Sequence, residues 1–232
     1  MQLFYTPDIE KNPKLTEEEA RHCIRVLRLN EGSEIDLTDG KGNFYKAVIT
    51  QAHPKHCLVS IKEKIPQILF WGFHLHIAVA PTKNIDRMEW FVEKTTEIGI
   101  NTITFLNCRH SERKEIKCER IEKIIVGAMK QSLKATLPVL NGMMDFKTFV
   151  KQPFEGRKLI AHCEPEEKPL LKQICHPGEN ALILIGPEGD FSKEEIALAK
   201  QEGFTAISLG ESRLRTETAA LTACQTMHFI NQ

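Results

Sequence analysis

Two glycine-containing segments of the sequence carry the residue types that bind ligands and move charge. The first runs from Ile185 to Ser192 (IGPEGDFS), after an apolar run and before a helix start. The second runs from Leu209 to Thr218 (LGESRLRTET) and adds two arginines. Glycine lets a backbone approach a ligand closely, and ligands of α/β proteins bind beyond the carboxyl ends of strands. Two such loops after neighbouring strands predict one shared pocket.

A purely structural interpretation of the same residues stays open. Each segment also fits an ordinary tight turn between a strand and a helix, with surface arginines and with Thr216 or Thr218 as a helix cap. The spacing matches neither a dinucleotide-binding GxGxxG fingerprint nor a Walker A loop. The sequence contains no GxSxG nucleophile elbow.

Histidine and cysteine come together at two places that could suggest a metal. His53 and His56 lie beside Cys57, and His74 lies two residues before His76. Neither group has the second half of a zinc site at a plausible spacing. The sequence therefore predicts no metal.

An alternation of strands and helices that begins near Phe73 must position the two segments. The expected strands are His74–Ala80, Thr102–Leu106, Lys158–Cys163, Ala181–Ile185 and Ala206–Leu209. The expected helices are Asp86–Ile98, Glu119–Lys134, Ser192–Gly203 and Thr216–Ile230. Such alternation favours an α/β fold with a parallel sheet. His162, near the end of its strand, is placed to complete the wall of the pocket.

The N-terminal part has a different pattern. Short strands are expected at Leu3–Tyr5, Glu34–Thr38, Asn43–Thr50 and Cys57–Ile65. The turn-rich tetrad Asp39–Gly42 predicts a hairpin, and the spacing of Thr16 and Glu19 predicts a helix start. Short strands with one helix favour a small β-barrel. Pro66–Gly72 is the expected linker, so we expect one domain over residues 1–70 and another over 73–232.

Composition limits the classes of function. The chain has 232 residues with 31 basic and 31 acidic side chains, which argues against a nucleic-acid binder that relies on bulk positive charge. Local arginine clusters remain, and either could contact phosphates or form ion pairs on a solvated surface. They comprise Arg21, Arg25 and Arg28, then Arg109 and Arg113. The first three lie at i, i+4 and i+7, which puts them near one face if the helix after Thr16 persists. Seven cysteines without a CxxC pair, no export signal and no membrane-length apolar run predict a cytoplasmic protein away from the membrane.

The motifs together resemble the RsmE family of 16S ribosomal RNA (uracil-N3) methyltransferases. The segments that carry the likeness are HCIRVLR from His22, KTTEIG from Lys94, Gln131-Ser132 before Pro138, GPEG from Gly186 with Phe191-Ser192, and LRTETA from Leu214. The likeness spans nearly the whole chain. One departure is Asp190, which stands where the family commonly has a second glycine.

The resemblance implies a fold, a cofactor and a substrate. Residues 1–70 would form a PUA-like RNA-binding β-barrel, and residues 73–232 a SPOUT methyltransferase domain with a trefoil knot. S-adenosyl-L-methionine would bind in the knot. The reaction would methylate N3 of a uridine in the decoding region of 16S rRNA within the 30S subunit. The protein would be a homodimer through its C-terminal domain, and helix Asp86–Ile98 has apolar residues beyond one stripe for that contact: Met88, Trp90, Phe91 and Val92.

The same resemblance distributes roles among the residues. Arg215 would stabilise the developing uracil anion, and Glu217 would orient the base or accept a proton; alternatively, Glu217 is a first-turn carboxylate favoured by the helix dipole. RNA binding would fall to the two arginine clusters. The expected cofactor-binding residues are His162, Ile185, Gly186, Glu188, Gly189, Leu209, Gly210 and Leu214.

Three other functions stay open at this point. A methyltransferase of the same fold could act on a ribose 2′-hydroxyl instead. A non-catalytic assembly factor could use the barrel and the basic clusters to bind RNA. A mononucleotide-binding α/β enzyme would use the glycine loops for phosphate.

Overall fold

The glycine segments follow strands of a six-stranded sheet. The computed structural model describes residues 2–232, and this sheet belongs to a unit formed by Phe70–Ile125 and Pro138–Gln232. Its strands are β5 (Leu75–Val79), β6 (Thr102–Asn107), β7 (Val139–Asp145), β8 (Arg157–Ala161), β9 (Ala181–Ile185) and β10 (Thr205–Ile207). Every pairing is parallel, in the order β10-β8-β9-β5-β6-β7. The predicted parallel α/β sheet is confirmed.

The order of the strands brings the predicted loops together. The glycine segments follow β9 and β10, and β8, which ends just before His162, lies between these two strands. The next strand beyond β9 is β5. Carboxyl ends of parallel strands meet at one edge of a sheet, so the loops after all four strands share that edge.

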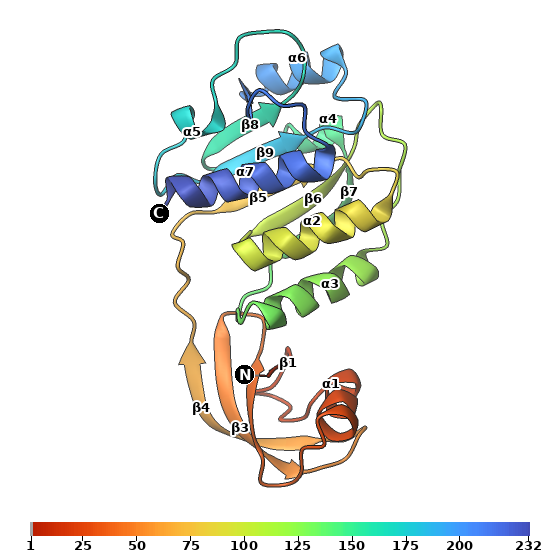
Figure 1. The fold of residues 1–232 in the computed structure, drawn as a ribbon, viewed down its shortest axis with the longest axis vertical. Helices are drawn as coiled ribbons and strands as arrows, with labels where there is room; N and C mark the ends of the chain where they lie inside the picture. The colour runs from red at the N-terminus through yellow and green to blue at the C-terminus, as the bar shows by residue number, and fades with distance from the viewer. Residues whose placement is uncertain (1) are drawn as a thin grey trace. The chain divides into compact units, whose positions relative to one another are not determined.

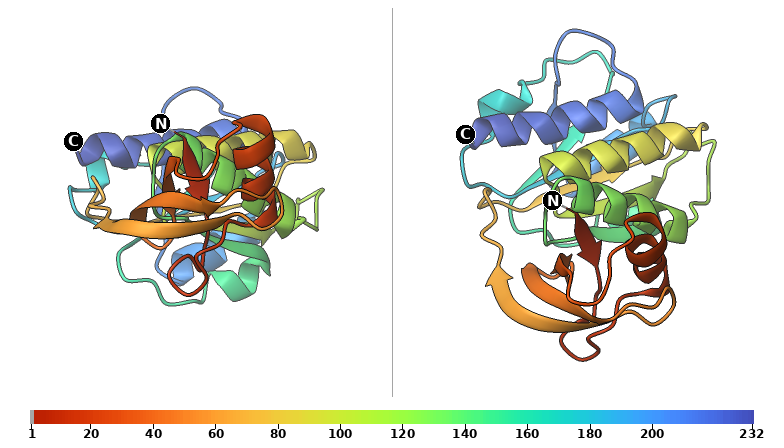
Figure 2. Two further views of the ribbon diagram at one scale, coloured as in Figure 1. Left: turned by 90° about the horizontal axis from the view of Figure 1, so that it is seen from below. Right: turned by 60° about the horizontal axis from the view of Figure 1, so that its bottom comes forward.

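Helices cover both faces of this sheet (Figures 1 and 2). They are α2 (Ile85–Ile98), α3 (Cys118–Gln131, which continues into the other unit), α4 (Phe146–Phe149), α5 (Leu171–Ile174), α6 (Lys193–Gln201) and α7 (Thr216–Ile230). On one face α2 and α7 pack side by side, with α7 against β5 and β9. On the other face α4 and α6 cover an apolar core that includes Phe146, Ile196 and Ala199.

The helix that precedes the pocket loops in sequence has clear end signals. Asn84 Oδ1 accepts a hydrogen bond from the N–H of Asp86 at 3.0 Å and starts α2. Gly99, with φ +131°, ends it. Of the four apolar residues expected to extend beyond one stripe, only Trp90 is exposed, at 42%. Met88, Phe91 and Val92 are buried, so most of that apolar surface serves the core rather than a partner.

In this unit the structure differs from the predicted elements at α3, at β7 and at the short helices α4 and α5, which were not predicted. The helix expected to reach Lys134 ends at Gln131, because Leu133 adopts a positive φ of 53°. Strand β7 was not predicted, because Asn141 and Gly142 interrupt its apolar pattern and most of its side chains are only partly buried.

The other unit comprises residues 2–69 together with Val126–Leu137. Its four-stranded sheet has the order β1 (Leu3–Tyr5), β2 (Glu34–Thr38), β3 (Asn43–Gln51) and β4 (Leu58–Pro66). The predicted hairpin around Asp39–Gly42 joins β2 and β3, which pair antiparallel. An apolar core that includes Phe4, Leu37 and Tyr45 lies within this unit.

The helix expected to carry the first arginine cluster is shorter than required. The α-helix α1 (Glu17–Arg21) passes into a π-helix, η1 (His22–Val26), and Arg28 lies beyond it with φ 56°. The expected i, i+4, i+7 alignment is therefore wrong: a π turn is wider than an α turn, and a left-handed residue ends the helix.

Candidate active site

A pocket of about 920 Å³ opens at the carboxyl edge of the parallel sheet. Its walls come from the loops after β8, β9 and β10. Nine of the ten residues predicted for the cofactor and the reaction line it: His162, Ile185, Gly186, Glu188, Gly189, Leu209, Gly210, Leu214 and Arg215. The volume falls within the range of about 300–1,000 Å³ that is usual for small-molecule sites.

The loop after β9 is tied to two other elements. Thr216 Oγ1, at the start of α7, donates to the carbonyl of Gly186 at 3.1 Å. Asp190 has φ 63°, a conformation that glycine adopts without cost and most residues avoid. Its Oδ2 accepts from the N–H of Cys163 at 2.7 Å, and its Oδ1 accepts from the N–H of Phe191 at 2.8 Å. These bonds give a reason for aspartate at this position.

The loop after β10 is shaped by a serine and a glycine. Ser208 Oγ accepts from the N–H of Gly210 at 3.2 Å and donates to its carbonyl at 3.1 Å. Gly210 has φ +131°, which side chains rarely allow, and a Cβ placed there would meet nothing within 4 Å. The loop thus leaves open space beside a backbone that only glycine forms readily, as a ligand cradle requires.

His162 and Lys168 form the wall after β8. The ring of His162 is buried, and its Nε2 lies 2.9 Å from Glu166 Oε1 at an angle that gives no hydrogen bond. Lys168 Nζ donates to the carbonyls of His162 and Glu164 at 2.8 and 2.7 Å. Burial, and then the charge of Lys168, lower the pKa of His162 below its usual value, so the ring is neutral near pH 7.

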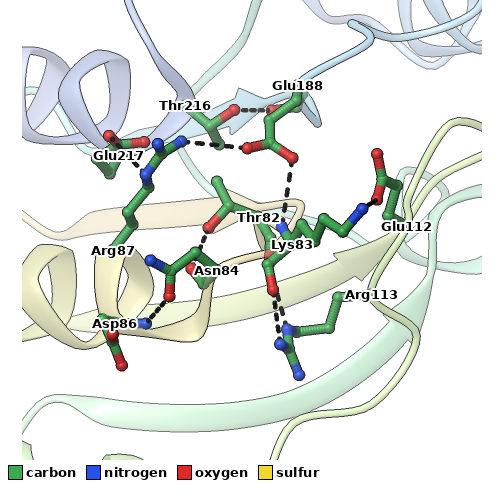
Figure 3. Close-up of polar contacts among 11 residues, drawn as sticks. Thr82, Lys83, Asn84, Asp86, Arg87, Glu112, Arg113, Glu188, Thr216 and Glu217 are labelled. Atoms are coloured by element: carbon green, nitrogen blue, oxygen red, sulfur yellow. Dashed lines mark hydrogen bonds and ion pairs between the residues drawn. The ribbon is translucent and has the colours of Figure 1, made fainter.

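Glu217 is the predicted residue that does not line the pocket. It lies in the first turn of α7 with a side chain only 10% exposed, and its Oε1 is 3.8 Å from Nε of Arg87. Arg87, in the first turn of α2, lines the pocket and was not predicted. Its Nη1 lies 3.2 Å from Oε1 of Glu188, so its guanidinium stands between two carboxylates (Figure 3). A cation at a helix N-terminus is unusual because the dipole disfavours it, but this pattern does not show which carboxylates Arg87 meets.

The predicted RNA-binding arginines lie outside this pocket. Arg109 Nη1 pairs with Glu194 at 3.0 Å, and Arg21 pairs with Glu17 at 3.4 Å. Arg25 and Arg28 are exposed. Arg113 differs, because it donates to the backbone carbonyls of the loop between β5 and α2. No other arginine of the two predicted clusters binds this loop among residues 2–232.

Residues 2–232 hold neither a metal-binding cluster nor a membrane-spanning helix. No group of three or more acidic, histidine or cysteine side chains in this range is arranged to hold a metal ion. No helix within the same residues is long and apolar enough to cross a membrane.

Comparisons with known proteins identify the family. The chain matches a family model described as an RNA methyltransferase domain over residues 71–228, and one described as an RNA methyltransferase PUA domain over residues 15–62. It is 30% identical to the ribosomal RNA small subunit methyltransferase E of Buchnera aphidicola, over 97% of this chain and 92% of that protein. The chain belongs to the RsmE family of RNA methyltransferases.

Solved structures agree with membership of the RsmE family. A crystal structure of a probable rRNA-methyltransferase from Porphyromonas gingivalis is 45% identical and has a TM-score of 0.95, covering 100% of this chain and 98% of that one. A ribosomal RNA small subunit methyltransferase E from Neisseria gonorrhoeae, bound to S-adenosyl methionine, is 27% identical with a TM-score of 0.87 over 100% and 98% of the two chains. In this RsmE-family chain every residue that lines the pocket lies within the methyltransferase match.

Proposed function

We propose that this methyltransferase transfers a methyl group from S-adenosyl-L-methionine to N3 of a uridine in the decoding region of 16S rRNA. The substrate would be the 30S subunit in the cytoplasm. One observation carries the proposal: the two loops that bear the family's motifs, after β9 and β10, line a single pocket of about 920 Å³ together with the loop after β8. The relative from Neisseria gonorrhoeae, solved with S-adenosyl methionine, supports the choice of cofactor.

The residues around the pocket fit this cofactor. Gly210 leaves open space where a side chain would stand, and the neutral ring of His162 forms an uncharged part of the wall. When bound, the cofactor supplies an electrophilic methyl group on a sulfonium sulfur. We assign its binding to His162, Ile185, Gly186, Glu188, Gly189, Leu209, Gly210 and Leu214.

The chain's own residues would supply the rest of the chemistry. N3 of uracil is a poor nucleophile while it carries its proton, and it lies on the Watson–Crick edge, so the base must leave any pairing first. Arg215 is exposed in the pocket at the N-terminus of α7, where its charge and the helix dipole would both stabilise the uracil anion. Glu217, one residue into the same helix, would accept the proton.

RNA binding would be divided between two domains, 1–70 and 73–232. The PUA match over residues 15–62 supports an RNA-binding role for the N-terminal domain. There we assign phosphate contacts to Arg21, Arg25 and Arg28, and in the C-terminal domain to Arg109 and Arg113. Contacts with phosphates position an RNA without reading its sequence, so base choice would fall to the pocket.

The finer features of the fold also belong to the proposal. A trefoil knot is supported by the return of the chain from the edge strand β10 to the sheet centre, where α7 packs on β5 and β9. A barrel is supported by a bridge between Lys14 and Leu58 that adds to the four-stranded sheet. A homodimer through α2 and α7 is supported by exposed Trp90 and Phe229, and light scattering that gives a mass of 26.5 kDa would refute it.

Methyl transfer to isolated 30S subunits tests the function directly. With cofactor labelled in the methyl group, we expect label in 16S rRNA and, after digestion to nucleosides, N3-methyluridine by mass spectrometry. A 2′-O-methylated nucleoside would favour the ribose-modifying alternative. Calorimetry that gives no heat with S-adenosyl-L-methionine would favour a non-catalytic RNA-binding protein.

A further inference from the structure

A buried carboxylate oxygen beside the pocket has no structural partner. Glu217 is nearly buried, and within residues 2–232 its Oε2 accepts no hydrogen bond. Buried oxygens normally find a donor, and exceptions cluster where a group has a chemical task. Thr216, its neighbour in the chain, and Arg87, which lies 3.8 Å from its other oxygen, both line the pocket, so this carboxylate lies directly behind the pocket wall.

Arg87, which pairs with Glu217, occupies an unusual position for a cation. The positive end of the α2 dipole disfavours a guanidinium in the first turn, so the location requires compensating charge. Glu188 and Glu217 provide it from the loop after β9 and from the start of α7. Figure 3 shows the guanidinium between the two carboxylates. Arg87 therefore connects two separate elements of the site while it lines the pocket itself.

The loop that leads into α2, just before Arg87, is also held by hydrogen bonds. The N–H of Lys83 donates to Oε2 of Glu188 at 3.3 Å. The carbonyls of Thr82 and Lys83 accept from Nε and Nη2 of Arg113 at 3.2 and 2.6 Å. Figure 3 shows these contacts converging on the loop that leads into α2. The loop is fixed by side chains from two directions, and so is the helix start that carries Arg87.

We propose that Arg87 is a positioning residue for methyl transfer, which fixes Glu217 as a charged acceptor beside the pocket. This role rests on the proposed function. The proton on uracil N3 passes to Oε2 of Glu217, and the electron pair left on N3 forms the bond to the methyl group. The leaving sulfur keeps the pair of the bond that breaks, so it loses its positive charge. Arg87 acts on this sequence through Glu217 and touches neither N3 nor the methyl group.

Kinetics of four variants test the role, with 30S subunits as substrate. In Arg87→Gln and in Glu217→Gln we expect kcat to fall about 100-fold, with the KM of both substrates changed less than about threefold, because positioning acts on the chemical step. The double variant should be no slower than either single variant, because both changes disable one unit. Arg87→Lys should recover about tenfold of the loss, since a lysine supplies the charge without the forked geometry.

Arg120→Gln is the matched control. Arg120 also pairs with two carboxylates of α2, Asp86 and Glu89, but lies outside the pocket. Its kcat should stay within about twofold of wild type, because surface ion pairs contribute little. A second readout needs no turnover. In chemical unfolding of the cofactor-free variants, the losses in free energy of unfolding from the Arg87 and Glu217 changes should not add up in the double variant.

The outcomes separate the two hypotheses. Additive losses of kcat, or a raised KM with unchanged kcat, would overturn the positioning role. So would an additive cycle in the unfolding measurements. A wild-type protein that forms no N3-methyluridine would refute the proposed function and this role together. An active wild type whose Arg87 variants keep their kcat would refute only the role of Arg87.

Discussion

The carboxylate of Asp190 joins two walls of the pocket, because its Oδ2 accepts a hydrogen bond from the N–H of Cys163 at 2.7 Å. Cys163 belongs to the wall after β8 and Asp190 to the wall after β9. The bond spans two segments that are far apart in the sequence. It fixes the distance between walls that a cofactor must fit.

Replacing this aspartate tests that function. Asp190→Gly removes the strain of φ 63° but also both accepted hydrogen bonds, so we expect cofactor affinity to fall about tenfold. Asp190→Asn keeps one acceptor oxygen, so its cofactor affinity should lie between those of wild type and Asp190→Gly. Calorimetry with S-adenosyl-L-methionine measures the affinities. Unchanged affinity in the glycine variant would show that the bridge does not shape the pocket.

Gly210→Val should abolish cofactor binding. Its φ of +131° is strained for valine, at a cost of about 1–3 kcal/mol in the free energy of unfolding, and the side chain enters the space left for the ligand. Gly203 is a matched control, since it has φ +87° and equally open surroundings but lies outside the pocket. Gly203→Val should lose similar stability, as chemical unfolding will show, and keep its affinity. Equal affinity in both variants would contradict the assignment of the pocket.

His76 should make the free energy of unfolding depend on pH. Burial lowers its pKa from 6.5 to about 4, and its Nε2 lies 2.8 Å from Thr104 Oγ1. The unfolded chain takes up a proton as the pH falls below 6.5, but the folded chain does not do so until about pH 4. Stability therefore falls across this window, by up to about 3 kcal/mol from this group. Denaturant unfolding between pH 4 and 8 should show that the free energy of unfolding changes less with pH in His76→Gln than in wild type. The control is His176→Gln, at an exposed histidine, which should show the wild-type dependence on pH. Identical slopes in all three proteins would exclude His76 as the source.

Arg25→Ala should weaken RNA binding without an effect on the cofactor. Arg25 is exposed, and losing one phosphate contact should lower the slope of log affinity against log salt by about one unit or less. Arg113→Ala should weaken the binding of both RNA and cofactor, because Arg113 also holds the loop whose Lys83 N–H donates to Glu188. Titrations with 30S subunits at several salt concentrations, beside calorimetry, separate the two cases. An Arg25 variant with wild-type affinity and slope would mean that its charge is only solvated.

The loops were predictable because glycine, proline and buried strands leave strong local signals. Ala181–Ile185 is apolar throughout and buried throughout, as a central parallel strand must be. Ser192 and Glu195 form the capping box that their spacing predicts. These features depend on neighbours in sequence, and so the sequence determines them locally.

Arg87 and Lys168 could not be predicted in the same way. Each reaches the pocket only because β5 and β8 both pair with β9, and no local pattern records that adjacency. The conformation of Asp190 is similar, since its cost is offset by a hydrogen bond to a residue 27 positions away. The π turn at His22–Val26 left no recognisable pattern either, and it displaced Arg28 from the expected face.

The strand β10, which precedes the third wall of the pocket, is also the last strand of its sheet in chain order. A ribosome making this protein completes β5, β6, β7, β8 and β9 before residues 209–216 exist. Chains generally fold in the order of their synthesis, N-terminal domains first. Until Thr216 is available to donate to the carbonyl of Gly186, the loops after β8 and β9 are present without the loop after β10. A growing chain therefore has no complete pocket at this edge of the sheet. The protein becomes able to modify ribosomal RNA only after that stretch has left the ribosome that made it.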